Sequence, residues 1–451
     1  MFTKDKSFYG TFRSLYPIIV LQNIIILSVT LVDNIMIGSY SETALAGVAA
    51  VNQIQFLFQQ LITASGDTIV VLGSQYWGQQ RTGPIRKISA GAMLIGVSFG
   101  LFLFLMSSLF PGQIVHFFTP SQEIVSEGVK YLNIIRFTYL VFPVTMILLA
   151  TLRSVERVRI AFWVSVSSLI CNCSINYLLI AGNFGAPEMG VRGAAVGTLV
   201  ARCLELAIVV CYLIFADKRL HLRITDYFHI DRTMMKDYLK VGLPTIVVGA
   251  LFGASTLLQS VILGHMNDTT LAANAVSTSL YQVLKVMSIG ASSTTGIIIG
   301  KTIGTGNIEK IKEYTRTLQW IFLGIGLITS ILLFVLRFPI LSLYDLTEET
   351  KQLANSYILV LCVTGIGTAY EMPVLTGIVR GGGDAKFVLY NDLISIWGIV
   401  LPLSFLAAFV FGWSSTAVVF CLNFDQIFKC GAAAIKVNRY NWIKKLTRPT
   451  A

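Results

Sequence analysis

Twelve long apolar runs constrain what this chain can fold into more than any other feature of its sequence. A helix of about 20 apolar residues spans a hydrocarbon core that is ~30 Å thick. The runs lie near residues 13–38, 45–76, 88–110, 124–152, 160–182, 191–216, 240–264, 270–300, 317–337, 352–379, 387–411 and 414–435. Only 13% of the residues are charged, whereas a typical soluble domain has about 25%. The sequence therefore predicts an all-α membrane protein with twelve transmembrane helices.

Lysine and arginine gather in alternate loops between these runs. Cytoplasmic loops of membrane proteins are enriched in both residues. With the N-terminus inside, the basic residues on that side include Lys4, Lys6 and Arg13, then Arg81, Arg86 and Lys87, then Arg153, Arg157 and Arg159, and the tail from Lys436 to Arg448. We therefore expect a multi-pass protein of the cell membrane with both termini in the cytoplasm. These loops account for the net charge of +11, so we expect no nucleic-acid partner.

The cysteines and histidines form no pattern typical of a metal site. All seven cysteines fall in the apolar runs, and the four histidines are scattered along the chain. Zinc sites normally combine such residues at short spacings. We expect no bound metal and no cofactor.

The second half of the sequence repeats the first half. The segment LVDNIMIGSYSETALAGVAA aligns with LLQSVILGHMNDTTLAANAV without a gap, and in the same register Gly78 falls on Gly304. When the second half is shifted by one further residue against the first half, Arg153 falls on Arg380. Chance similarity between apolar helices is the alternative, but the matches extend into loops and therefore favour a duplication.

The repeat also predicts how the chain divides. Six spans per repeat is an even number, so both halves have the same orientation in the membrane, as in parallel-repeat transporters. We predict an N-terminal six-helix lobe over residues 1–216 and a C-terminal six-helix lobe with a short basic tail over residues 237–451. The polar segment 217–236 is predicted to be a cytoplasmic linker.

Several phrases along the chain resemble the multidrug and toxic compound extrusion (MATE) transporters. They are VDNIMIG, LAGVAAVNQ, GSQYWGQ, NYLLIAGNFGAPEMGVRGAAVGT and VRGGGDAKFVLYNDLISIWGIVLPLSF. The resemblance covers nearly the whole chain. It implies two lobes that alternate between outward-open and inward-open states. It also implies export of cationic or amphipathic organic compounds in exchange for protons or sodium ions, by a protein that we expect to be a monomer in membrane lipid.

Asp33 places a carboxylate inside the first apolar run. A charge at the centre of a span costs ~2.5–3.5 kcal/mol on insertion scales, and such residues usually face a bundle interior or a water-filled cavity. The residues alone leave two interpretations open: proton exchange, because burial favours the neutral carboxyl, or a structural hydrogen bond within the lobe. The resemblance implies the first, because the matching acid of the family is an ion-coupling residue.

The resemblance also implies that two residues of the fifth span assist this acid. Asn172 and Asn176 lie four residues apart, on one face of a helix. Related transporters combine an asparagine and an aspartate at these positions, and the amide here favours protons over sodium, since hard cations prefer more charged or carbonyl oxygens. Pro17 matches a proline at which related transporters bend, so it is a candidate hinge; the alternative is a proline that merely starts the helix.

The second lobe lacks an acid in its first span, and Gln259 occupies the repeat position of Asp33. We therefore expect ion coupling in the first lobe. Polar stripes of helical period mark one face of the second and eighth spans. The candidates for a cargo-binding cleft are Gln59, Asp67, Gln259, Gln282, Lys285 and Glu371, for which satisfied interior polar groups are the alternative. Asp392 is expected to pair with Arg380 or Lys386.

Other classes of protein fit the sequence less well. A flippase for lipid-linked cargo is the nearest rival, but the related flippases resemble fourteen-span chains with several cavity arginines. Only Arg136 and Arg202 lie within spans here and away from their ends. We see no reactive constellation of the kind that an enzyme needs. A channel or receptor module does not require a duplicated lobe with a coupling acid. We therefore predict a proton-coupled antiporter, with a sodium-coupled exporter as the alternative, and not an enzyme.

Overall fold

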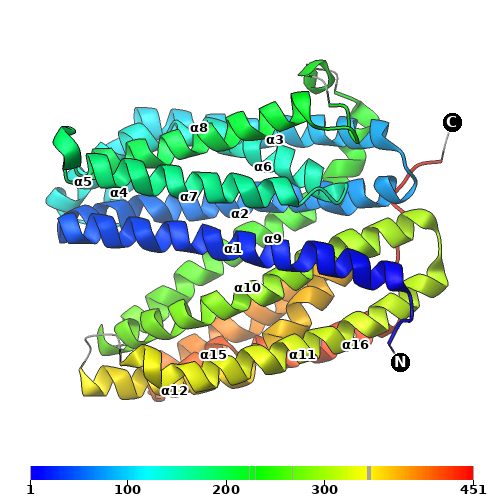
Figure 1. Cartoon of the computed structure of the whole chain (residues 1–451). Coiled ribbons are helices and arrows are strands. Elements are labelled where there is room, and N and C mark those ends of the chain that lie inside the picture. Colours follow the sequence, from blue (N-terminus) through cyan, green and yellow to red (C-terminus); the bar gives the residue numbers. More distant parts are fainter. Residues whose placement is uncertain (1, 223, 229, 267, 343–346, 450–451) are drawn as a thin grey trace. The chain divides into compact units, whose positions relative to one another are not determined.

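The computed structural model describes residues 2–222, 224–228, 230–266, 268–342 and 347–449. Helices make up most of this part of the chain, and it contains no β-strand (Figure 1). Eleven helices are long and apolar enough to cross a membrane, and a bent pair raises the number to twelve if it counts as one span. The predicted fold class, an all-α membrane protein with twelve transmembrane helices, is confirmed in this sense.

The spans are formed mainly by long single helices. In chain order they are α1 (Lys6–Tyr40), α2 (Glu42–Gly78), α3 (Thr82–Leu109), the pair α5 (Gln122–Ile135) and α6 (Thr138–Ser154), α7 (Arg159–Leu179), α8 (Val191–Phe215), α9 (Arg232–Gly264), α10 (Asp268–Thr305) and α11 (Ile308–Leu341). Three composite spans follow: α12 (Glu348–Met372) with η3 (Pro373–Val379); α13 (Ala385–Asp392), η4 (Leu393–Val400), α14 (Leu401–Phe405) and η5 (Leu406–Val410); and α15 (Ser415–Leu422) with α16 (Asp425–Asn438). The short elements α4 (Pro111–His116), η1 (Asn183–Gly185) and η2 (Ile224–Phe228) lie between spans.

The fourth and tenth spans are among those that depart from a straight α-helix. The fourth was expected to be continuous over 124–152, but α5 and α6 meet at an angle of 52°. In the tenth span, the helix widens into a π-helix that begins at Pro373. A proline has no N–H to donate to the preceding turn, and wide turns of this kind often lie near functional sites. Glu371 lies just before this change.

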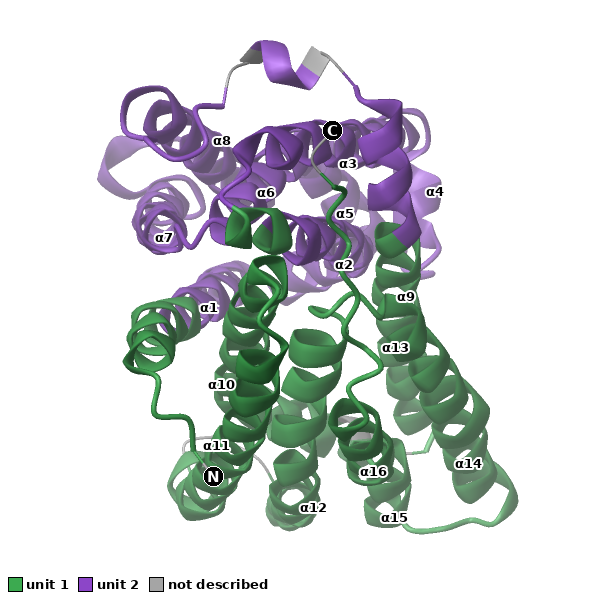
Figure 2. Ribbon diagram, turned by 90° about the vertical axis from the view of Figure 1, so that its right-hand side faces the viewer, with its two compact units in different colours: residues 1–20, 74–79, 241–451 green, residues 21–73, 80–240 purple. Residues whose placement is uncertain are grey.

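The described chain forms two compact units (Figure 2). Unit 1 comprises residues 1–20, 74–79 and 241–451, and unit 2 comprises residues 21–73 and 80–240. Each unit has its own buried apolar core: Val51, Ile62 and Leu132 belong to that of unit 2. The lobe boundaries at 216 and 237 stay a prediction.

Within unit 1, the end of α2 contacts the end of α10 at two glycines that the sequence repeat equates. A Cβ atom on Gly78 would lie 2.1 Å from the Lys301 carbonyl oxygen, and one on Gly304 would lie 2.0 Å from the Gln75 carbonyl oxygen. Only glycine allows the two backbones to approach this closely.

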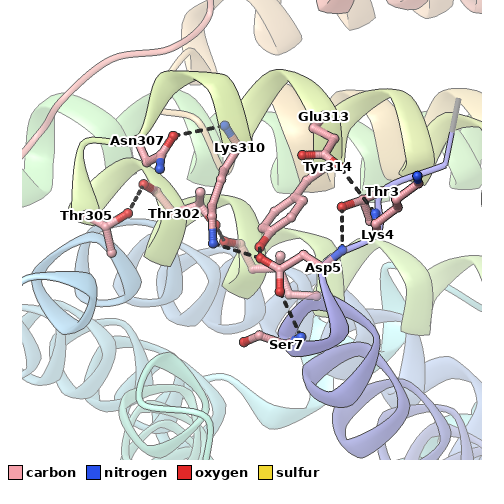
Figure 3. A network of polar contacts seen from close by, with 11 residues as sticks. Thr3, Lys4, Asp5, Ser7, Thr302, Thr305, Asn307, Lys310, Glu313 and Tyr314 are labelled. Atoms are coloured by element: carbon pink, nitrogen blue, oxygen red, sulfur yellow. Dashed lines mark hydrogen bonds and ion pairs between the residues drawn. The ribbon is translucent and has the colours of Figure 1, made fainter.

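The N-terminal segment is fixed to the start of α11 (Figure 3). The Asp5 carboxylate accepts hydrogen bonds from Lys310 Nζ at 2.8 Å, from the Tyr314 hydroxyl at 2.6 Å and from the Ser7 backbone N–H at 2.9 Å. These donors, Lys310 above all, lower the pKa of Asp5 to about 2. Asp5 is therefore ionised at neutral pH and ties the N-terminus to the same end of unit 1 as the α10–α11 turn.

The C-terminal tail is fixed to the same unit by the end of α2. The Gln75 side chain donates to the Lys444 carbonyl at 3.1 Å and accepts from the Leu446 N–H at 2.8 Å, so it pairs with the tail backbone on both sides. Gln79 Nε2 donates to the Thr447 hydroxyl at 2.7 Å. The tail backbone is thus held by side chains of a helix from the other half of the sequence.

Asp384 provides the ionic part of this attachment. Its carboxylate accepts from Lys436 Nζ at 2.8 Å and from Lys444 Nζ at 2.7 Å. Burial alone would raise the pKa of Asp384, but the two ammonium groups outweigh burial and hold the pKa below its ordinary value. The ion pairs therefore stabilise the attached tail fully above the ordinary carboxyl pKa, and this contribution is lost as the pH falls through the lowered pKa of the folded state.

Asp384→Asn is expected to loosen the tail at neutral pH, where the parent carboxyl is charged. Backbone amides of residues 444–448 should exchange with deuterium about tenfold faster, because hydrogen bonds to charged groups contribute ~1.5 kcal/mol each. Asp5→Asn is the matched control, since it removes another paired carboxylate and should leave tail exchange unchanged. Equal tail exchange in the parent and in Asp384→Asn would contradict the assignment.

Candidate functional site

In unit 2, the acid of the first span meets the two asparagines of the fifth. Asn176 Nδ2 donates to Asp33 Oδ1 at 2.6 Å and is 3.3 Å from Asn172 Oδ1. Asn176 and Asn172 are almost completely buried, with 0% and 1% of their surface exposed, respectively. Asp33 is half-buried. The i, i+4 spacing on α7 places both amides on one face, and α1 presents its carboxylate to that face.

Helix α8 supports this arrangement from the other side. Asn172 Nδ2 donates to the Thr198 hydroxyl at 3.3 Å. Gly197 gives α8 the space to pack against Asn176, because a Cβ atom there would lie only 2.1 Å from Asn176 Oδ1. The orientation of both amides toward Asp33 therefore depends on α8 as well as on α7.

Arg202 is the cation of unit 2 that acts electrostatically on Asp33. Its guanidinium is paired with Glu205 on the same helix at 2.9 Å and lies 5.0 Å from the centre of the Phe142 ring. Within the described residues, Asp33 has no ion pair shorter than 4 Å. A carboxylate that interacts with neutral amides and has no direct counter-charge is suited to bind a proton or a small cation.

A second group of ionisable side chains lies inside unit 1. The Lys429 side chain on α16 is only 4% exposed and contacts Asp392 at 2.8 Å and Asp425 at 2.9 Å. Asp392 belongs to α13, whereas Asp425 is one turn before Lys429 on α16. The ammonium group thus links α13 to α16 and compensates the charges of two largely buried carboxylates. Lys429 is the ion-pair partner of Asp392 in the structure.

Glu371 and Lys285 lie near this group. Glu371 interacts electrostatically with Lys429, Asp425, Asp392 and Lys285. Neither Glu371 nor Lys285 forms an ion pair within 4 Å among the described residues, although Lys285 Nζ lies 5.8 Å from the centre of the Phe252 ring. The cluster, which we call the Lys429 cluster, therefore holds three carboxyl groups and two amines: Glu371, Asp392, Asp425, Lys285 and Lys429.

The sequence model described as MatE matches this chain twice, over residues 17–178 and 244–406. The matches begin at Pro17 and Pro244, and the register that pairs these two prolines is the one that pairs Arg153 with Arg380. The repeat found in the sequence and the two matches therefore agree. The chain belongs to the MatE family.

This MatE protein has curated relatives that match over most of its length. The uncharacterized transporter YisQ of Bacillus subtilis is 24% identical over 86% of this chain and 84% of its own. The probable multidrug resistance protein NorM of Thermotoga maritima is 24% identical over 85% of this chain and 82% of its own.

Solved structures of two transporters share the fold of the MatE protein. VcmN, a MATE transporter of Vibrio cholerae, has a TM-score of 0.87 and 15% identity, and covers 98% of this chain and 99% of its own. A MOP-superfamily transporter from Pyrococcus furiosus has a TM-score of 0.85 and 15% identity, covering 97% and 98%. At this identity the likeness concerns the fold.

The remaining predicted site residues of the MatE protein fall in both units. Asp67 on α2 interacts electrostatically with Arg153 of α6. Gln59 on α2, Gln259 on α9 and Gln282 on α10 form no side-chain hydrogen bond within the described part of the chain, which leaves their amides available. Their part in cargo binding stays a prediction.

Pro17 lies well inside α1, which begins at Lys6. The interpretation as a helix-start proline is therefore wrong. At this depth the proline leaves one backbone carbonyl of the preceding turn without its usual donor, and its role as a hinge stays a prediction.

Sequence reasoning missed Lys429 and Thr198 as parts of these clusters. A signal for Lys429 was present: the register that aligns Arg153 with Arg380 also places Arg202 on Lys429. Both halves of the sequence therefore carry a cation at the same position of their last span. Thr198 gave no signal, because one hydroxyl in an apolar helix is ordinary.

Proposed function

We propose that this protein is a secondary active antiporter that exports cationic or amphipathic organic compounds in exchange for protons by alternating access. One observation carries the proposal: the Asp33 carboxylate accepts a hydrogen bond from Asn176 at 2.6 Å and has no ion-pair partner within 4 Å among the described residues. Such a group is neutral with a proton and charged without one. Binding and release of this proton can then favour one of the two states of the transporter over the other.

The surroundings of Asp33 favour a proton over a sodium ion. Among the described residues, the side chains that hydrogen-bond in this site contribute amides and a hydroxyl rather than a second carboxylate. Sodium, like other hard cations, prefers several charged or carbonyl oxygens. The sodium-coupled exporter remains the second candidate, because Asn172 Oδ1 and the Asp33 carboxylate are both turned toward Asn176 and supply oxygen atoms.

The names of several relatives support export of drugs, since they are called probable multidrug resistance proteins. We propose the cell membrane as the location, with both termini in the cytoplasm, and a monomer as the working unit.

Export against a concentration gradient distinguishes this function from that of a passive channel, which only equilibrates its solute.

Cargo flux in proteoliposomes tests the proposal. The parent protein is reconstituted with an ethidium-like dye, and either a pH gradient or a sodium gradient is imposed while the other ion is kept equal on both sides. We expect the pH gradient alone to concentrate the dye above equilibrium. Transport driven by sodium alone would establish the second candidate, and dye that merely equilibrates under both gradients would indicate a channel.

A further inference from the structure

A groove of about 540 Å³ opens on the surface of unit 1 between α11, α12 and α16. The three helices lie side by side in this unit, α12 between the other two (Figure 2). The volume is within the ~300–1,000 Å³ typical of ligand sites. No residue that lines the groove is one of the five ionisable residues of the Lys429 cluster, so the groove needs an explanation of its own.

One end of the groove is polar. Gln319 accepts from the Tyr370 hydroxyl at 2.8 Å and from Asn438 Nδ2 at 3.4 Å, which fixes a rim of hydrogen-bonding groups. Arg316 lines the same end, is exposed, and forms no hydrogen bond or ion pair with any described residue. An uncompensated guanidinium over a polar rim attracts an anionic group.

The other end of the groove is apolar. Trp320, Leu323 and Ile366 form its walls, and Gly431 and Ala434 leave the space between them open. Trp320 is 59% exposed, which places its ring at the mouth of the groove. A hydrocarbon chain suits such a slot, because within a membrane apolar groups associate through close van der Waals packing.

The polar end faces the part of the unit that holds both chain termini. Arg316 lies eight residues after Ile308, the first residue of α11, so it is ~12 Å from that helix end at a rise of 1.5 Å per residue. The distribution of basic loops predicts that this end faces the cytoplasm. Tryptophan and arginine are typical anchors at this depth of a membrane, and the cytoplasmic leaflet carries the anionic lipids.

We propose that this groove, lined by Arg316, Trp320 and Gly431, is a binding site for one anionic phospholipid of the cytoplasmic leaflet. The phosphate contacts Arg316 and the amide rim, and one acyl chain occupies the slot along Trp320 and Leu323. The site is independent of ion coupling, because none of these side chains belongs to the Asp33 site or to the Lys429 cluster.

The test is lipid binding to the full-length protein. Delipidated protein in detergent is titrated with dioleoyl-phosphatidylglycerol or dioleoyl-phosphatidylcholine, and bound lipid is counted by native mass spectrometry. Arg316→Gln should weaken phosphatidylglycerol binding about fivefold and leave phosphatidylcholine unchanged, since one basic residue near an anionic lipid contributes about that factor. Gly431→Leu should block both lipids, because nothing lies within 4 Å of an added Cβ and the side chain fits into the slot.

Gly324→Leu is the matched control for the filled slot. Gly324 lies on α11 with nothing within 4 Å of an added Cβ, but it does not line the groove, so lipid binding by this variant should equal that of the parent. Equal binding by Gly431→Leu and Gly324→Leu would overturn the site. Equal binding of both lipids by the parent would overturn the assignment of an anionic headgroup.

Discussion

Asp33→Asn is expected to abolish dye accumulation driven by a pH gradient while dye binding survives. The asparagine keeps the size of the side chain but cannot exchange a proton. In a one-for-one exchange of a proton for a monovalent cation, one pH unit corresponds to ~1.4 kcal/mol and sustains a cargo gradient of about tenfold. The variant should therefore show a cargo ratio near one in the same proteoliposomes.

A second variant tests the position of the acid rather than its charge. In Gly197→Ala the added Cβ would lie 2.1 Å from Asn176 Oδ1, so the amide has to move and its 2.6 Å hydrogen bond to Asp33 is strained or lost. We expect accumulation between that of the parent and that of Asp33→Asn, and a shifted pH profile.

Two controls accompany these variants. Glu42→Gln changes an exposed carboxylate at the start of α2, and Gly83→Ala adds a methyl group where nothing lies within 4 Å. Both should transport like the parent. Parental accumulation by Asp33→Asn would show that this acid is structural, and coupling would then be sought at Glu371 or Asp67.

Lys429→Met is expected to have the largest effect on stability. It leaves Asp392 and Asp425 largely buried without the ammonium group that contacts them at 2.8 and 2.9 Å. Breaking a buried ion pair by removing one partner costs about 3–5 kcal/mol, because the remaining charges are uncompensated. Thermal unfolding of the purified protein in detergent should show a clearly lower midpoint.

The neutral counterpart separates the loss of charge balance from the loss of packing. Lys429→Met combined with Asp392→Asn and Asp425→Asn removes both carboxylates that the lost ammonium group had paired with, so it should recover most of the lost stability. Lys285→Met is the matched single change, since Lys285 has no ion pair within 4 Å in the described part of unit 1, and it should destabilise much less. A midpoint for Lys429→Met equal to that of Lys285→Met would refute the role of the cluster.

The sequence by itself determined the elements that depend on local pattern. Apolar runs long enough to span a membrane predicted the number of spans. The sequence repeat agrees with the two MatE matches, which begin at Pro17 and Pro244. The i, i+4 spacing of Asn172 and Asn176 predicted one polar face on the fifth span. The hydropathy of a run and the period of a helix are properties of neighbouring residues, so they can be read without knowledge of the fold.

Only the tertiary structure decided which polar groups meet across helices. The residues around Asp392 do not indicate that it pairs with Lys429, which is 37 residues away. The residues around Gln75 likewise do not indicate its hydrogen bond to the tail, 371 residues later. The continuous apolar run over 124–152 also gave no sign of the 52° bend between α5 and α6. Such contacts are set by which helices pack side by side and by their rotation about their own axes, and one residue of register changes the partner of every side chain.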